Sequence, residues 1–356
     1  MSVPQRAVQL TEPSEFLKEH PEVQFVDLLI ADMNGVVRGK RIERNSLPKV
    51  FEKGINLPAS LFALDITGST VESTGLGLDI GDADRICYPI PGTLSMEPWQ
   101  KRPTAQLLMT MHELEGDPFF ADPREVLRQV VARFTEMELT IVAAFELEFY
   151  LIDQENVNGR PQPPRSPISG KRPQSVQVYS IDDLDEYVEC LQDIIDGARA
   201  QGIPADAIVA ESAPAQFEVN LNHVNDALKA CDHAVLLKRL VKNIAYDHEM
   251  DTTFMAKPYP GQAGNGLHVH ISLLDKHGNN IFTSEDPEQN AALRHAIGGV
   301  LETLPASMAF LCPNVNSYRR FGSQFYVPNA PSWGLDNRTV ALRVPTGSPD
   351  AVRLEH

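Results

Sequence analysis

Strand segments in which polar and apolar residues alternate constrain the fold of this chain more than any other feature of its sequence. In residues 216–221, Gln216, Glu218 and Asn220 alternate with apolar side chains. Because successive side chains of a strand point to opposite faces, such a strand has one polar and one apolar face. The apolar face must be covered. The pattern therefore predicts an antiparallel sheet with helices behind it, in an α+β fold.

The 356 residues are expected to form two regions that meet near residue 105. In the first region, Asn34-Gly35 separates two extended apolar runs, which predicts a β-hairpin. The other elements expected there are strands at 24–30 and 36–42, a short helix at 48–53, an ordered loop over 57–81 and a proline-rich connection between the regions at 88–103.

The second region is expected to alternate strands and helices. Asp122-Pro123 predicts a helix start, with Asp as the N-cap and Pro at the first helical position. The expected strands are 105–111, 139–152, 207–211, 216–221, 252–256, 267–274 and 340–344. The expected helices are 181–201, 226–250 and 288–304, the last ending before Pro305, and residues 156–174 are expected to form a loop.

Two carboxylates interrupt the apolar strand at 139–152. Glu146 and Glu148 lie two residues apart, so they share one face, where they repel unless a cation or a proton intervenes. A single pair of this kind is more often the solvated face of an edge strand. The pair alone therefore does not establish a metal site.

The acidic pattern recurs further along the chain, which favours a metal site. Glu211 and Glu218 flank a short turn, and His268, His270 and Ser272 share one face of the strand at 267–274. Carboxylate-rich ligation favours magnesium (Mg²⁺) or manganese (Mn²⁺) over zinc. The number of ligands allows two or more ions, which suits phosphoryl chemistry.

Arginines gather downstream among aromatic residues. Arg319, Arg320, Arg338, Arg343 and Arg353 are either ordinary surface residues or bidentate clamps for carboxylate and phosphate. With the upstream carboxylates, they indicate a magnesium-dependent phosphoryl-transfer enzyme. The sequence contains neither a P-loop nor a kinase-type glycine loop with its H-R-D motif.

Charge and hydropathy exclude several other classes of protein. The formal net charge is −17, which argues against a nucleic acid partner, since such proteins need a basic face. No apolar run reaches the roughly 18 residues of a membrane span, and residues 1–16 carry no secretory signal pattern. The four cysteines are far apart and form no C-x-x-C pair, so we expect a cytoplasmic protein without disulfides.

Taken together, these motifs resemble the glutamine synthetase superfamily. The resemblance covers nearly the whole chain and is closest to the gamma-glutamylpolyamine synthetase branch. The segments that carry it, in the family's order, are Asn34-Gly35, Glu146-Leu147-Glu148, residues 211–218, Phe254-Met255-Ala256-Lys257-Pro258, residues 266–272, residues 314–320, Asn337-Arg338 and Arg343.

The resemblance implies an architecture. It implies an N-terminal β-grasp domain at residues 1–104 and a catalytic domain at 105–356, built on a curved antiparallel sheet with helices behind it. It also implies ring-shaped homo-oligomers, dodecamers in full-length members, with each active site between neighbouring subunits.

The resemblance also implies a reaction. ATP phosphorylates the γ-carboxylate of glutamate, and an amine then displaces phosphate to leave an amide. The loss of a flap glutamate, replaced here by Tyr326, favours a primary amine or polyamine such as putrescine. The alternatives are a glutamine synthetase that uses ammonium and an inactive, structural member of the same fold.

Site residues follow from the same resemblance. One metal would be held by Glu148, Glu211 and Glu218, and the other by Glu146, His268 and Glu355. The remaining implied roles are His270 and Ser272 beside the nucleotide phosphates, Arg343 at the transferring phosphoryl group, Arg338 in the phosphate region, Arg320 on a glutamate carboxylate, Arg353 on the nucleotide side, and Asp65 at the amine.

Three further departures from the family pattern matter. Ala263 replaces an asparagine that contacts glutamate in ammonia-using enzymes, so the contacts to glutamate must differ in part. Ala215 replaces a glycine, and it would be strained if the turn requires a positive φ. The chain ends at His356, one position before an expected arginine, and is expected to be truncated relative to the family.

Overall fold

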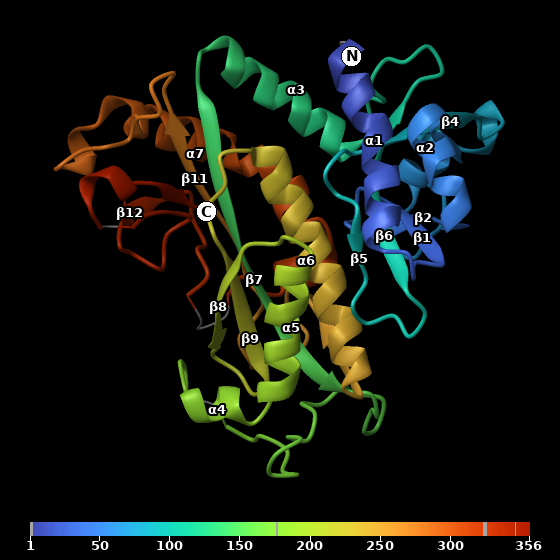
Figure 1. Cartoon of the computed structure of the whole chain (residues 1–356). Coiled ribbons are helices and arrows are strands. Elements are labelled where there is room, and N and C mark those ends of the chain that lie inside the picture. The colour runs from blue at the N-terminus through green and yellow to red at the C-terminus, as the bar shows by residue number, and fades with distance from the viewer. Residues whose placement is uncertain (1–2, 176, 323–325, 346) are drawn as a thin grey trace. The chain divides into compact units, whose positions relative to one another are not determined.

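The computed structural model describes residues 3–175, 177–322, 326–345 and 347–356 (Figure 1). It divides into two compact units, Met1–Val130 and Val131–His356. No helix among the described residues combines the length and the apolar character that crossing a membrane requires.

The first unit contains a mixed sheet in the order β2-β1-β6-β4-β3, with β5 paired to β6. Its elements are α1 (Val3–Glu19), β1 (Phe25–Ala31), β2 (Val37–Glu43), α2 (Leu47–Lys53), β3 (Ile55–Pro58), β4 (Asp84–Pro89), β5 (Ser95–Met96), β6 (Thr104–His112) and the start of α3 (Pro123–Glu136). Buried residues of α2, such as Val50 and Phe51, belong to the same apolar core as β1 and β6. A helix packed on a mixed sheet agrees with the predicted β-grasp fold.

The Asn34-Gly35 hairpin is confirmed. Strands β1 and β2 pair in antiparallel register, from Phe25 opposite Glu43 to Ala31 opposite Val37. Gly35 has a φ of 68°, a value that glycine adopts without a steric penalty.

Two predictions about the join between the regions are wrong. Residues 88–103 do not connect two domains, because β5 lies within them and pairs with β6 in the first sheet. The strand predicted at 105–111 is β6, which pairs with β1 and β4 rather than opening the second region. The chain therefore divides between Val130 and Val131 instead of near residue 105.

The second unit contains a sheet in the order β12-β13-β14-β11-β7-β9-β8, with β10 paired to β7. Every pairing in it is antiparallel except that of β12 with β13. Its elements are β7 (Thr140–Asp153), α4 (Ile181–Asp185), α5 (Val188–Ala200), β8 (Ala205–Ala210), β9 (Gln216–Leu221), α6 (Ala227–Asp247), β10 (Met250–Thr253), β11 (Leu267–Leu274), α7 (Ala291–Leu311), α8 (Val315–Tyr318), β12 (Trp333–Leu335), β13 (Leu342–Val344) and β14 (Leu354–Glu355).

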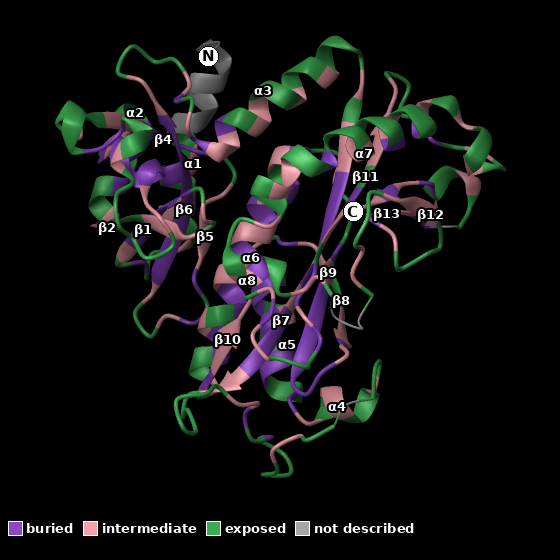
Figure 2. Cartoon of the chain, turned by 180° about the vertical axis from the view of Figure 1, so that it is seen from behind, coloured by how far each residue is buried: buried purple, intermediate pink, exposed green. Residues whose placement is uncertain are grey.

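The apolar face of this sheet is covered by helices, as the alternation predicted. Figure 2 shows long buried stretches on β7 and β9. Phe149 of β7 and Phe217 of β9 contact each other with ring centroids 6.2 Å apart, and Phe217 also packs against Tyr187 at the start of α5. Burial of these aromatic residues holds the strands in one register. The polar side chains of the strands then lie together on the opposite face, where they can form a binding site.

Two predicted helices differ from the observed ones. The helix predicted at 181–201 is interrupted at Tyr187, whose ring is buried and whose hydroxyl donates to the carbonyl of Pro164 at 3.0 Å. The helix predicted to end before Pro305 continues to Leu311. The buried residues of α7 all precede Pro305, and Phe310 and Leu311 beyond it are exposed, so the helix extends past the proline on the protein surface.

Candidate active site

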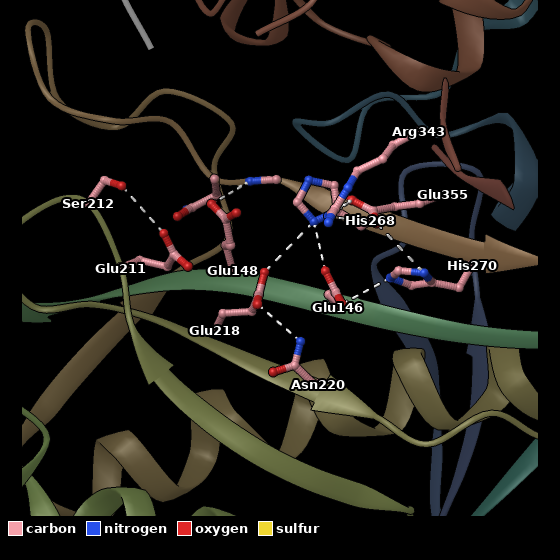
Figure 3. Close-up of polar contacts among 12 residues, drawn as sticks. Glu146, Glu148, Glu211, Ser212, Glu218, Asn220, His268, His270, Arg343 and Glu355 are labelled. Atoms are coloured by element: carbon pink, nitrogen blue, oxygen red, sulfur yellow. Dashed lines mark hydrogen bonds and ion pairs between the residues drawn. The ribbon is translucent and has the colours of Figure 1, made fainter. Parts of the chain in front are cut away.

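Strand register in the second sheet brings the predicted carboxylates together. Glu148 of β7 lies opposite Glu218 of β9, and Glu146 lies opposite His268 of β11. Their side chains converge on one face of the three strands (Figure 3). Leu147, between the two glutamates of β7, points to the opposite face and is buried.

Histidines bridge the carboxylates on this face. Nδ1 of His268 lies 3.0 Å from Oε2 of Glu146 and 3.8 Å from Oε2 of Glu218. Nε2 of His270 lies 2.9 Å from Oε1 of Glu146. Burial alone would raise the pKa of Glu146, but its hydrogen bond with His268 and the close ring of His270 outweigh burial and hold that pKa well below its ordinary value.

At Glu218 and Glu211, burial and neighbouring negative charges outweigh the favourable contacts instead. Burial, and then the charges of Glu146 and Glu148, raise the pKa of Glu218. Burial and the charge of Glu148 raise the pKa of Glu211 to about 7. Negative charge thus exceeds what the described residues neutralise, so the site favours a cation.

The donor set fits divalent metal ions. Glu146, His268 and Glu355 each offer a ligand atom, and these atoms lie within 4.8 Å of one another; Glu148, Glu218 and His268 form a second such group. The first group is the set predicted for one metal. The second contains two of the three ligands predicted for the other, and Glu211 lies outside it.

Glu211 follows β8 in a turn whose backbone is strained. Its N–H donates to the carbonyl of Gln216 at 2.8 Å, which closes the turn between β8 and β9. Ala215 in this turn has a φ of 57° and is buried. The positive φ that was considered for this position is therefore present, and it is adopted by an alanine at a steric cost.

Two arginines join the site through strand β14 and its preceding turn. Arg343 of β13 lies opposite Glu355 and donates to its Oε2 at 3.1 Å. Arg353 donates through Nε to Nδ1 of His270 at 3.0 Å. The structure thus brings both arginines into the network that contains Glu146.

Arg320 follows helix α8 and lies beside the turn that precedes β11. A Cβ atom at Gly264 would lie 2.4 Å from the carbonyl oxygen of Ala256, which requires glycine there, and 3.0 Å from Nε of Arg320, which places Arg320 beside this turn. That Nε is buried and has no hydrogen-bond partner among the described residues. Asn316 of α8 exchanges two hydrogen bonds with the backbone of Lys257, at 2.7 and 2.9 Å, which anchors the helix before Arg320.

The structure does not join the remaining predicted residues to this network. Arg338 is exposed and makes no hydrogen bond or ion pair with the described residues. Asp65 belongs to the first unit, where its Oδ1 accepts from the N–H groups of Thr67 and Ser69 and from the Thr67 hydroxyl. The Thr67 hydroxyl and these N–H groups lower the pKa of Asp65, which makes it a weak base.

A cavity of about 500 Å³ opens beside Ser272. His223, Asn225, Asp226 and Lys229 also line it, and the rings of His223 and His270 lie 5.7 Å apart. Ser272 was predicted from the alternation of its strand. The lining residues from His223 to Lys229 follow β9, and nothing in the sequence indicated that they line a cavity.

Known proteins resemble this chain over most of its length. The family described as glutamine synthetase, catalytic domain, matches residues 120–356. The chain belongs to the glutamine synthetase family. Gamma-glutamylputrescine synthetase PuuA of Escherichia coli is 45% identical over 346 residues, which cover 97% of this chain and 73% of the relative.

Two further relatives extend the comparison within the glutamine synthetase family. Glutamate–isopropylamine ligase of a Pseudomonas species is 32% identical over 356 residues, covering 98% of this chain and 76% of the relative. The structure of GmaS in complex with ADP superposes with a TM-score of 0.80 at 28% identity, covering 97% of this chain and 75% of that one. The predicted family and fold are confirmed.

Proposed function

We propose that this protein is an ATP-dependent ligase that joins the γ-carboxylate of glutamate to a primary amine, with a putrescine-like polyamine as the acceptor. The observation that carries the proposal is the cluster of Glu146, Glu148, Glu218 and His268 on one sheet face, in a chain 45% identical to a gamma-glutamylputrescine synthetase. The 32% identity to a glutamate–isopropylamine ligase supports an amine acceptor in general.

Two divalent ions, magnesium or manganese, would be held by this cluster. Glu146, His268 and Glu355 would bind one ion, and Glu148, Glu211 and Glu218 the other. When bound, such ions neutralise the phosphate oxygens during phosphoryl transfer. The raised pKa values of Glu211 and Glu218 support this, because a cation relieves the repulsion that raises them.

Arginines and the cavity would bind the anionic substrates. ATP would enter the cavity beside Ser272, with its phosphates directed towards His270, Arg353 and Arg343. Arg320, whose buried Nε lacks a partner among the described residues, would bind a carboxylate of glutamate. Arg338 would reach the phosphate region from its exposed segment.

Two steps would complete the reaction. An oxygen of the glutamate γ-carboxylate attacks the γ-phosphorus of ATP, and the bond to ADP breaks. The amine nitrogen then attacks the γ-carbonyl carbon, phosphate leaves, and the nitrogen loses a proton. Asp65 would attract the ammonium form of the substrate, since its lowered pKa suits ionic binding better than proton abstraction.

The acceptor separates this proposal from glutamine synthesis. Tyr326, which stands where ammonia-using relatives carry a flap glutamate, is 75% exposed. A neutral flap suits a larger amine better than ammonium. We also infer cytoplasmic, ring-shaped homo-oligomers, as the family resemblance implies.

Phosphate release with ATP, Mg²⁺, glutamate and a panel of acceptors tests the proposal. We expect turnover with putrescine and little with ammonium. Strong turnover with ammonium and none with diamines would make the protein a glutamine synthetase. An inactive, structural member would show no magnesium-dependent thermal stabilisation by ATP.

A further inference from the structure

The two oxygens of Glu148 have different surroundings. Oε2 accepts from the N–H of Gly266 at 2.8 Å and from Nε2 of Gln216 at 3.2 Å. Among the described residues, Oε1 accepts no hydrogen bond. A carboxylate held by donors on one oxygen keeps its other oxygen available for a cation.

Gln216 is a buried amide with a fixed orientation. It is 1% exposed, and its Nε2 lies 3.1 Å from the carbonyl of Gly264 and 3.1 Å from Oδ1 of Asn265, besides its bond to Glu148. All three neighbours are acceptors, so this end of the side chain must be the amide nitrogen. Its position is set by the turn before β11 as well as by Glu148.

Asn265 anchors this arrangement to the backbone. It is 5% exposed, and its Nδ2 donates to the carbonyls of Thr253 at 3.1 Å and Met255 at 3.0 Å. Its Oδ1 faces Gln216, and its own N–H donates to the carbonyl of Ala256 at 3.0 Å. Asn265 therefore has no freedom to turn without losing several buried hydrogen bonds.

Gly266 shows where the unpaired oxygen points. A Cβ atom at this position would lie 3.0 Å from Oε1 of Glu148 and 3.2 Å from Nε2 of His268. Oε1 therefore lies on the side of the metal cluster. The neighbouring Gly264 approaches Arg320 equally closely, so one turn borders both the acidic cluster and the arginine.

We propose that Gln216 and Asn265 are positioning residues, which form a hydrogen-bonded relay that holds Oε2 of Glu148 and presents Oε1 to one of two divalent cations. The inference rests on the proposed function, because it assigns Glu148 to a metal site. It adds that a buried amide pair, which is not itself a ligand, sets the affinity of that site.

The test measures Mn²⁺ binding to the purified protein without ATP or glutamate, from the electron paramagnetic resonance signal of the free ion. Gln216→Met keeps the size of the side chain and removes the donor. We expect about tenfold weaker Mn²⁺ binding at one site and wild-type binding at the other. In a Glu148→Gln background, Gln216→Met should cause no further loss. Wild-type affinity for Gln216→Met, or an equal loss in both backgrounds, would overturn the relay.

Tyr150→Phe is the matched control. Tyr150 is 1% exposed, and its hydroxyl donates to the carbonyl of Ala263 at 2.6 Å, so this variant also removes a buried bond to the same turn. Among the described residues, the Tyr150 hydroxyl makes no hydrogen bond to Glu148, so we expect unchanged Mn²⁺ affinity. A tenfold loss in Tyr150→Phe would show that rigidity of the turn, and not the relay, governs binding.

Two more variants separate the possible failures. If Gln216→Met lacks the wild-type circular dichroism spectrum, Asn265→Ala is measured in its place. We expect Asn265→Ala to weaken Mn²⁺ binding at the same site by less than tenfold. Wild-type Mn²⁺ affinity in Asn265→Ala would refute the relay. If Glu218→Ala retains both Mn²⁺ ions, the metal assignment in the proposed function is wrong. If Glu218→Ala loses an ion while Gln216→Met and Asn265→Ala bind normally, only the relay is wrong.

Discussion

Buried carboxylates have opposite surroundings in the two units of this protein. Asp32, in the hairpin of the first unit, is 3% exposed, and both of its oxygens are satisfied: Oδ1 accepts from the N–H groups of Asn34 and Val36, and Oδ2 accepts from Nε of Arg38. Glu218, in the second unit, is 8% exposed, yet its close neighbours include Glu146 and Glu148. Asp32 is thus surrounded by donors, whereas Glu218, among the described residues, accepts one hydrogen bond from a side chain, that of Asn220 at 3.0 Å, and lies among like charges.

The difference separates structural from functional charge. A buried carboxylate surrounded by donors stabilises the fold and needs nothing more. A buried carboxylate crowded by others raises the free energy of the empty protein until a cation binds. Burial is nearly the same at Asp32 and Glu218, so the nature of the neighbours, and not the exposure, identifies the site.

The largest effect is expected from Glu218→Gln. Loss of one metal ligand should lower kcat/KM for γ-glutamyl amide formation by at least about a hundredfold, equivalent to several kcal/mol of transition-state stabilisation. At alkaline pH, where Glu218 is ionised despite its raised pKa, the same change removes a repulsive charge, so the melting temperature in the presence of a chelator should rise. Near-normal activity would contradict the metal assignment, and a fall in melting temperature would contradict the comparison with Asp32.

Asp32→Ala should have the opposite profile. It leaves Arg38 and two N–H groups without their acceptor, so the free energy of unfolding should fall by about 3 kcal/mol. Urea denaturation followed by circular dichroism measures this, with Glu43→Ala, at an exposed position in the same hairpin, as the control. Mn²⁺ affinity of the folded protein should not change. Weaker Mn²⁺ binding would show that the hairpin carboxylate is not purely structural.

The dependence of stability on pH offers a finer test. Because the pKa of Glu211 is raised to about 7 in the folded protein, its contribution to stability is present below its unfolded pKa of about 4.3 and is lost as the pH rises through 7. With chelator, the melting temperature should therefore fall between pH 5 and pH 8, and Glu211→Gln should flatten this slope. With Mg²⁺, binding displaces the proton, so stabilisation by the ion should grow with pH. An unchanged slope in Glu211→Gln would show that Glu211 is not the titrating group.

The smallest effect concerns backbone strain. The hairpin meets its need for a positive φ with Gly35, whereas the turn between Glu211 and Glu218 uses Ala215 at 57°. Ala215→Gly should raise the free energy of unfolding by about 1 kcal/mol, measured by urea denaturation. Ala213→Gly, at a buried position of the same turn without a positive φ, should instead lower it. Destabilisation by both variants would mean that the turn is not strained.

Local patterns predicted much of the fold. The bounds of β9 and β11 match the predicted strands, and α6 lies within the helix predicted at 226–250. The placement and extent of some other elements were not predicted. Strand β6 joins the first sheet by pairing with β1, a partner to which local propensity has no access. Helix α7 also continues through Pro305 to Leu311, which the proline rule did not predict.

The candidate site divides in the same way. Glu146, Glu148, Glu218, His268 and His270 were predicted because alternation places each on a polar face. Gln216 was recognised only as part of that alternation, and nothing in the sequence indicated that it donates to Glu148. Asn265 and His223 carried no signal, because each acts through a neighbour that lies far away in the chain.

The sequence by itself determined which side chains share a face of each strand, because the two-residue period of a strand is a local property of its stereochemistry. It also determined the family, through motifs in a specific order. Only the tertiary structure decided that Glu148 lies opposite Glu218 and Glu146 opposite His268, because register depends on packing between strands distant in the chain. That register decides which buried charges find partners, and so which of them are left to bind a cation.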